Sequence, residues 1–123
     1  MDGWIFIDKP KNITSFDVIQ KLRRILNIKK IGHSGTLDPF ATGILAVALG
    51  KATKSIHYFN PHKVYAFNIV FGESKDTDDI TGKTVNRSNI IPTLEEIDQC
   101  LKKFTGKLTQ VPPKYSAVKV NGK

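Results

Sequence analysis

The sequence predicts a single domain of the α+β class. Its 123 residues are the length of one ordinary domain. Short apolar segments typical of strands are separated by segments with helical spacing, including a short helix at residues 51–59. No internal repeat, low-complexity tract or linker divides the chain, so one core is expected. The predicted strands are residues 4–7, 44–49, 64–71 and 115–120.

Two longer helices are predicted from their capping residues. The first begins at Thr14 or Ser15, whose hydroxyl group can accept the free backbone N–H groups of the first turn. The second begins with a capping box of Thr93 and Glu96, and Gly106 is expected to end it. The expected apolar faces are Phe16, Ile19, Leu22 and Leu26 on the first helix, and Leu94, Ile97, Leu101 and Phe104 on the second.

The chain is basic, with 19 Lys and Arg against 11 Asp and Glu and a formal net charge of +8. The excess is concentrated in residues 1–63, which hold ten basic and four acidic side chains. Such a basic half is typical of proteins that bind polyanions, with nucleic acid the leading candidate. A basic face that only meets water has the same composition, so charge alone leaves both interpretations open.

Composition also excludes several classes of protein. The longest apolar run, residues 44–49, is far shorter than the ~20 residues of a membrane-spanning helix, so no membrane span is expected. The first residues lack the basic start of a signal peptide. Cys100 is the only cysteine, which excludes an internal disulfide framework and fits a reducing cytoplasm.

Residues 32–43 are the most unusual segment, because three glycines and a proline interrupt the apolar pattern there. The predicted long loop presents Asp38 between two apolar elements, which is a natural place for function. Taken alone, an aspartate in such a loop more often caps a turn. No second acid lies near Asp38, so a glycosidase pair of carboxylates is excluded. The acidic stretch 76–79 lacks the residue pattern of a calcium-binding loop, and no metal site is expected.

Five segments of the chain match the motifs of one enzyme family, in the order in which that family carries them. The central segment reads GHSGTLDPFATGIL at residues 32–45. The others lie at residues 9–15 (K-P-x-G-x-T-S), 50–54 (G-x-A-T-K), 63–79 (K-x-Y and T-D-T-x-D) and 110–119 (Q-x-P-P-x-Y-S-A-x-K). By these motifs the chain resembles the TruB-type tRNA pseudouridine synthases, and more closely the bacterial stand-alone enzymes than the guide-RNA relatives.

The resemblance implies the pseudouridine synthase catalytic fold, which has a mixed, mainly antiparallel sheet with flanking helices. Residues 1–123 would be the N-terminal part of that catalytic domain, without the C-terminal RNA-binding domain. It also implies a cytoplasmic, monomeric enzyme that converts uridine 55 in the T loop of tRNA to pseudouridine without metal or cofactor. The alternative is a non-catalytic RNA-binding or tRNA-chaperone module that keeps the same fold.

The resemblance assigns roles to four residues. Asp38 matches the catalytic aspartate, whose carboxylate can attack the sugar or the base or abstract a 2′ proton. Tyr65 matches a tyrosine that contacts the uracil ring, although without the motif an aromatic strand face is the preferred explanation for it. His33 matches a histidine that fills the space of the extruded base, and Asp76 matches an acidic residue that lines the site. Without the motif, His33 is an ordinary turn residue.

Two departures from the family pattern affect these expectations. Asn12 stands where the family usually has glycine, and we expect it to adopt the positive φ of that turn. The family's next motif, Y-x-x-A-R, lies beyond Lys123, and its arginine pairs with the catalytic aspartate. The hairpin signal Asn121-Gly122 has no return strand, which indicates a fragment. Residues 1–123 alone are therefore expected to be nearly inactive and only marginally stable, since a buried Asp38 would lack its partner.

Overall fold

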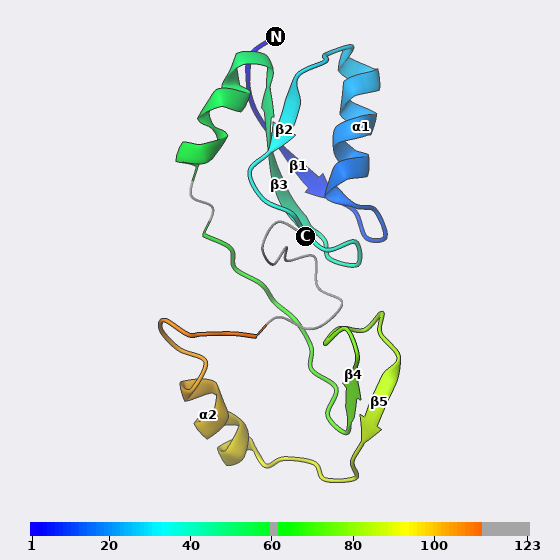
Figure 1. Ribbon diagram of the computed structural model, residues 1–123, viewed down its shortest axis with the longest axis vertical. Coiled ribbons are helices and arrows are strands. Elements are labelled where there is room, and N and C mark those ends of the chain that lie inside the picture. The colour runs from blue at the N-terminus through cyan, green and yellow to red at the C-terminus, as the bar shows by residue number, and fades with distance from the viewer. Residues whose placement is uncertain (60–61, 112–123) are drawn as a thin grey trace. The chain divides into compact units, whose positions relative to one another are not determined.

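The computed structural model describes residues 1–59 and 62–111. The predicted strand at residues 115–120 and the Asn121-Gly122 turn lie outside the described residues. The chain divides into two compact units, Met1–Tyr65 and Ala66–Lys123, which are described separately below. Each unit is coloured by residue number in Figure 1.

A three-stranded antiparallel sheet in the order β1-β3-β2 forms the centre of the first unit (Figure 1). Its strands are β1 (Gly3–Lys9), β2 (Ile31–His33) and β3 (Gly43–Leu49). β3 pairs with β1 along its full length, from Gly3 opposite Leu49 to Lys9 opposite Gly43. The predicted strands at residues 4–7 and 44–49 are confirmed. The loop predicted to begin at Gly32 was wrong at its start, because the backbone of residues 31–33 pairs with β3.

Helix α1 (Ser15–Leu26) covers one face of this sheet (Figure 1). Thr14 is its N-cap and forms a capping box with Asp17, which confirms the predicted start. The core between helix and sheet consists of Val18, Ile19, Ile31, Leu37, Leu45, Val47 and Leu49. Phe16 was wrongly placed on the buried face, since it is 63% exposed and Val18 is buried instead. At 100° per residue, Phe16 lies about a quarter turn from the centre of the buried stripe.

The element η1 (Gly50–Tyr58) follows β3 and confirms the short helix predicted at residues 51–59, as a 3₁₀ helix. The Thr53 hydroxyl donates to the Gly50 carbonyl at 2.7 Å, and the Ser55 hydroxyl donates to the Ala52 carbonyl at 2.7 Å. Such side-chain bonds compete with the ladder of an α-helix. The end of this segment is tied to β1, because the Trp4 indole N–H donates to Ser55 and the Trp4 ring stacks on Phe59 at 4.8 Å.

The second unit contains a hairpin and one helix among its described residues. Its elements are β4 (Glu73–Lys75), β5 (Thr84–Arg87) and α2 (Leu94–Lys102). β4 pairs with β5, and neither of these two segments was among the predicted strands. The Thr93 and Glu96 capping box is confirmed. Gly106 does adopt a positive φ of 96°, but α2 ends earlier, at Lys102.

The strand predicted at residues 64–71 is absent from the described structure. A strand requires a neighbour that pairs with its N–H and C=O groups, and the described residues supply none for this segment. Its apolar side chains remain in contact with solvent, and Val64 is 96% exposed. Alternating hydrophobicity therefore identified a segment suited to a sheet without identifying its partner.

Among the described residues, no helix has the length and apolar character that crossing a bilayer requires.

The hairpin of the second unit is expected to weaken in acid. The Glu73 carboxylate pairs with Lys75 at 3.1 Å and with Arg87 at 3.4 Å. Its pKa lies below the ordinary value, chiefly because of the hydrogen bond from Lys75 and then that from Thr84. A lowered pKa in the folded state adds stability above about pH 4.3, the ordinary glutamate pKa, and this stability is lost as the pH falls through the folded pKa.

The measurement for this acid effect is the backbone amide spectrum of the hairpin between pH 7 and pH 2. We expect the β4 and β5 resonances to move toward unfolded positions only in the acidic part of this range, and the Glu73→Gln variant to lose most of that dependence. Hairpin resonances that are unchanged at pH 2 would contradict the claim that the ionised Glu73 carboxylate stabilises the hairpin.

Candidate functional site

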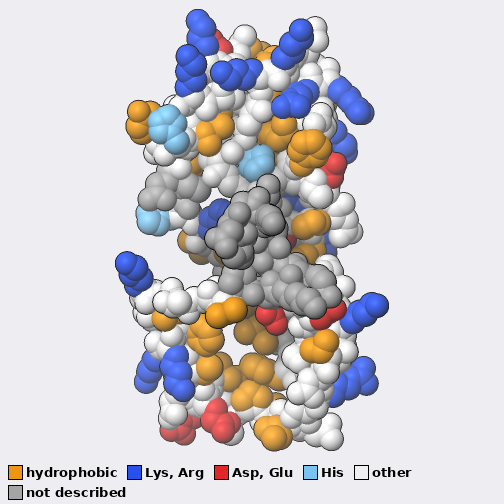
Figure 2. All heavy atoms as spheres, viewed as in Figure 1, with side chains coloured by type: hydrophobic (Ala, Val, Ile, Leu, Met, Phe, Trp, Pro, Cys, Tyr) orange, Lys and Arg blue, Asp and Glu red, His pale blue; other side chains and the backbone are white. Residues whose placement is uncertain are grey.

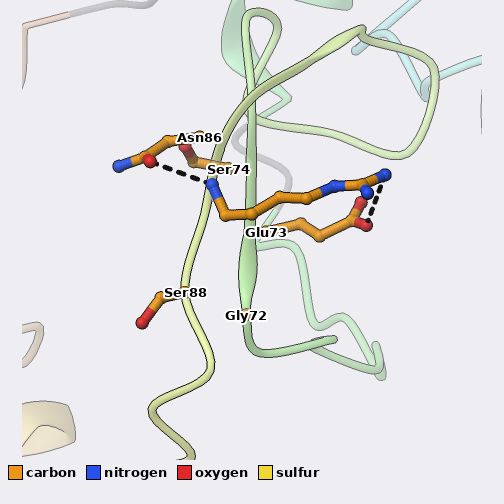
Figure 3. Close-up of a pocket in the computed structure, with 6 residues that line it drawn as sticks. Gly72, Glu73, Ser74, Asn86 and Ser88 are labelled. Carbon is orange, nitrogen blue, oxygen red and sulfur yellow. Dashed lines mark hydrogen bonds and ion pairs between the residues drawn. The ribbon is translucent and has the colours of Figure 1, made fainter.

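Each unit contains a hollow that could hold a ligand. The hollow of the second unit, about 220 Å³, lies beside the hairpin and is lined by both of its strands (Figure 3). Its only acidic side chain, Glu73, is already neutralised by Lys75 and Arg87. The cleft of the first unit is larger, about 450 Å³, and lies beside the loop that presents Asp38. We therefore take the cleft of the first unit as the candidate site.

The cleft has an apolar floor. In the pairing of β1 with β3, Phe6 lies opposite Ala46 and Asp8 lies opposite Ile44. The alternation of strand side chains places Phe6, Ala46 and Ile44 on the face opposite the core. Phe6 is 62% exposed there. The walls are Ser34, Gly35, Leu37 and Thr42 from the loop, together with residues 62–65.

Asp38 lies in the loop between β2 and β3, and its side chain is exposed. The two ion pairs within the described residues both involve Glu73, so none of these residues gives Asp38 a cationic partner. The expected burial of this carboxylate was wrong. The destabilisation that a buried, unpartnered carboxylate causes therefore does not apply to Asp38 here.

The backbone on the C-terminal side of Asp38 is held by the turn that follows β1. The Lys9 side chain is fully buried (0% exposed), and its ammonium group donates to the carbonyl oxygens of Pro10 at 3.0 Å, Ile13 at 2.8 Å and Pro39 at 3.3 Å. The Pro39 carbonyl also accepts the Asn12 N–H at 2.7 Å. Asn12 has a φ of 63°, which confirms the expected positive φ. Lys9 thus supports the loop and does not face the cleft.

The backbone on the N-terminal side of Asp38 is held by helix α1. The Ser15 hydroxyl accepts the Leu37 N–H at 2.9 Å and donates to the Leu37 carbonyl at 3.2 Å. Within the loop, the Ala41 N–H donates to the Asp38 carbonyl at 3.0 Å. The carbonyl groups of residues 37, 38 and 39 are therefore all hydrogen-bonded, while the Asp38 carboxylate is exposed.

The other predicted site residues have different positions. Tyr65 lines the cleft and is 51% exposed. His33 is half-buried at the end of β2, next to the lining residue Ser34, and its Nδ1 atom is buried without a hydrogen-bond partner among the described residues. Asp76 belongs to the second unit, where its carboxylate accepts the Lys83 N–H at 2.8 Å. Its role in the site stays a prediction.

Lys63 is a residue of the site to which the sequence analysis assigned no role. Its ammonium group donates to the Thr36 carbonyl at 3.0 Å and so connects the segment that carries Tyr65 to the loop that carries Asp38. The K-x-Y spacing at residues 63–65 was the available signal. The alternation of β1 was a second signal, because it puts Phe6 on the face opposite Ile5 and Ile7.

Comparison with known proteins identifies the family. The family model described as "TruB family pseudouridylate synthase (N terminal domain)" matches residues 23–123. The chain belongs to this family. The resemblance drawn from the motifs is thereby confirmed, and the small antiparallel sheets with a few helices are those of a pseudouridine synthase N-terminal domain.

The curated relatives extend the match over nearly the whole chain. It is 47% identical to tRNA pseudouridine synthase B of Ehrlichia ruminantium, across 99% of this chain and 42% of the relative. It is 49% identical to tRNA pseudouridine synthase B of Rhodospirillum rubrum, across 98% of this chain and 40% of the relative. The chain thus spans about two fifths of the length of these relatives.

One solved structure gives a comparison of fold. A chain from the crystal structure of a Cbf5-Nop10-Gar1 complex aligns with a TM-score of 0.63 at 34% identity. The alignment covers 95% of this chain and 31% of that one. The match therefore includes both units of the chain but only a minor part of the solved protein.

Proposed function

We propose that this protein isomerises uridine 55 in the T loop of tRNA to pseudouridine, and that residues 1–123 are the N-terminal part of its catalytic domain. The single observation that supports this most is the exposed Asp38 carboxylate on a loop fixed from both sides, beside a cleft that contains Tyr65. In the whole protein, a mixed, mainly antiparallel sheet and a C-terminal RNA-binding domain would complete the fold.

The proposed reaction is balanced without a cofactor. The C1′–N1 bond breaks, the uracil turns, and a C5–C1′ bond forms. C5 then loses its proton, and N1 holds a proton in the product. A carboxylate side chain can take part in these reaction steps as a nucleophile or as a base. The exposed position of Asp38 is compatible with each role.

The cleft is suited to a nucleotide that has left its stack. Extruding a base costs about a few kcal/mol, and stacking on an aromatic ring returns roughly 1–3 kcal/mol. In this proposal Tyr65 stacks on the uracil ring, with Phe6 in the apolar floor beneath it. His33 would fill the space that the base leaves in the T loop, and Asp76 would line the site.

The surface charge of the first unit supports an RNA partner. Figure 2 shows Lys and Arg side chains gathered over the end of this unit where α1 ends and η1 begins. Lys30 and Lys51 belong to this end, because the Lys30 carbonyl accepts the Gly50 N–H at 2.7 Å. A monomer that binds the T stem-loop with such a surface should lose affinity steeply with salt.

The test of this proposal is conversion of a tRNA transcript by the full-length gene product, with pseudouridine mapped by carbodiimide modification and primer extension. We expect one modified position, in the T loop, and the same modification in an isolated T stem-loop hairpin. A transcript with that uridine replaced by cytidine is the control and should remain unmodified. Tight binding of tRNA without any modified uridine would favour the RNA-binding or chaperone function instead.

Replacing Tyr65 separates stacking from other roles of this ring. Tyr65→Ala should lower kcat/KM by about 5- to 150-fold, which corresponds to a loss of roughly 1–3 kcal/mol of base stacking. Tyr65→Phe keeps the ring and should retain most substrate binding. Tyr58→Ala removes an exposed tyrosine of η1 outside the cleft and serves as the control. Equal kcat/KM values for Tyr65→Ala and the control would exclude the stacking role.

A further inference from the structure

We propose that Ser15 is a positioning residue, whose hydroxyl group sets the backbone from which Asp38 reaches the substrate. The inference rests on the proposed function and assigns it a residue outside the cleft. Ser15 is the first residue of α1, and its side chain is 1% exposed. It therefore acts on the reaction only through the loop.

The geometry is that of a closed pair of hydrogen bonds. The Ser15 hydroxyl group accepts a hydrogen bond from the Leu37 N–H at 2.9 Å and donates one to the Leu37 carbonyl oxygen at 3.2 Å. Leu37 is buried but belongs to no strand or helix, so its backbone groups require partners from elsewhere. One side chain supplies both partners, as a neighbouring strand otherwise would.

These bonds act directly on the orientation of Asp38. The Leu37 carbonyl belongs to the peptide group that joins Leu37 to Asp38, so Ser15 fixes the plane on one side of the Asp38 Cα atom. On the other side, the Asp38 carbonyl is held by the Ala41 N–H at 3.0 Å. With both peptide planes fixed, the direction of the Asp38 Cα–Cβ bond is set. A displacement of about 1 Å at a reacting group can cost on the order of 100-fold in rate.

Thr14 provides a matched control on the same helix. Its hydroxyl accepts the Asp17 N–H at 3.0 Å and caps α1, but the Leu37 backbone is bound by the Ser15 hydroxyl instead. Thr14→Ala and Ser15→Ala each remove one hydroxyl group at the start of α1. The two variants separate a loss of helix stability from a loss of loop geometry.

The experiment compares Ser15→Ala, Ser15→Cys and Thr14→Ala in the full-length gene product. We expect Ser15→Ala to lower kcat by about 10- to 100-fold with little change in KM, because the loop is displaced while the RNA contacts remain. The Leu37 amide should exchange with solvent faster in this variant. The thiol of Ser15→Cys fills the site but hydrogen-bonds weakly, so its kcat should be intermediate. Thr14→Ala should change stability alone.

The outcomes are separable. A kcat for Ser15→Ala within twofold of that for Thr14→Ala overturns the inference and leaves the proposed function intact. If Ser15→Ala does not fold, Ser15→Cys decides, and a kcat equal to that of the wild type overturns the inference. If the wild type itself converts no uridine, the proposed function fails. Faster Leu37 exchange confined to the Ser15 variants then still supports the role of Ser15 in holding the loop.

Discussion

Asp38→Asn in the full-length gene product is expected to abolish isomerisation while leaving tRNA binding intact. The amide has the size of the carboxylate but neither its charge nor its basicity, so every route in which Asp38 attacks or abstracts a proton is lost. Removing one member of a catalytic set commonly costs about 10⁴-fold or more in kcat. The dissociation constant for tRNA should stay the same or fall, because a negative charge is removed beside the RNA phosphates.

Asp98→Asn is the control for this variant, because it removes an exposed carboxylate from α2 that lines neither of the two hollows. Filter binding of tRNA and mapping of pseudouridine are measured on the same preparations. Turnover that survives in Asp38→Asn would remove Asp38 from the mechanism. Turnover that disappears together with tRNA binding would indicate a structural role instead.

Lys9→Met is expected to cause the largest loss of stability of any single substitution in the Asp38 loop and its supports. Three carbonyl groups lose the charged donor of Lys9. Among the described residues, the Pro39 carbonyl alone keeps another donor, the uncharged Asn12 N–H. Hydrogen bonds to charged groups contribute roughly 1.5–3 kcal/mol each. Burying the ammonium group also carries a desolvation cost of several kcal/mol that methionine does not have, so we expect the net fall in the free energy of unfolding to be only about 2–4 kcal/mol. Urea unfolding of the full-length gene product measures this change directly.

Lys29→Met is the matched control, since it makes the same substitution at an exposed lysine of the first unit. It should change the unfolding free energy by less than about 0.5 kcal/mol. Equal losses in the two variants would show that the buried Lys9 ammonium contributes nothing specific. A further consequence is that the Asn12 amide should exchange faster in Lys9→Met, because its acceptor at Pro39 is no longer fixed.

Local signals in the sequence located the elements whose cause is local. The capping residues Thr14 and Thr93 placed the start of both α-helices correctly, because a cap acts within one turn. The positive φ of Asn12 was also foreseen, since backbone preference is a property of the residue itself. Strands depended on distant partners. β2, β4 and β5 were missed, and the segment at residues 64–71 was wrongly assigned, because pairing is not encoded in the segment alone.

The same distinction holds for the candidate site. The motif at residues 32–45 identified Asp38 and its loop, and the K-x-Y motif identified Tyr65, which does line the cleft. The supports of the loop were not foreseen in detail. Ser15 lies 22 residues from Leu37, and Lys9 lies 30 residues from Pro39. Such contacts arise only after the sheet and α1 have brought the two segments together.

The most direct measurement is the distance between the side chain at position 38 and C1′ of the target uridine, in a crystal structure of the full-length Asp38→Asn protein bound to a T stem-loop RNA. We expect the uridine to be extruded into the cleft beside Tyr65, with its C1′ atom about 3–3.5 Å from the nearest atom of the substituted side chain, the separation of reacting groups held in position. A uridine that remains stacked in the T loop, or one that occupies the cleft while the side chain at position 38 points into solvent, would contradict this account.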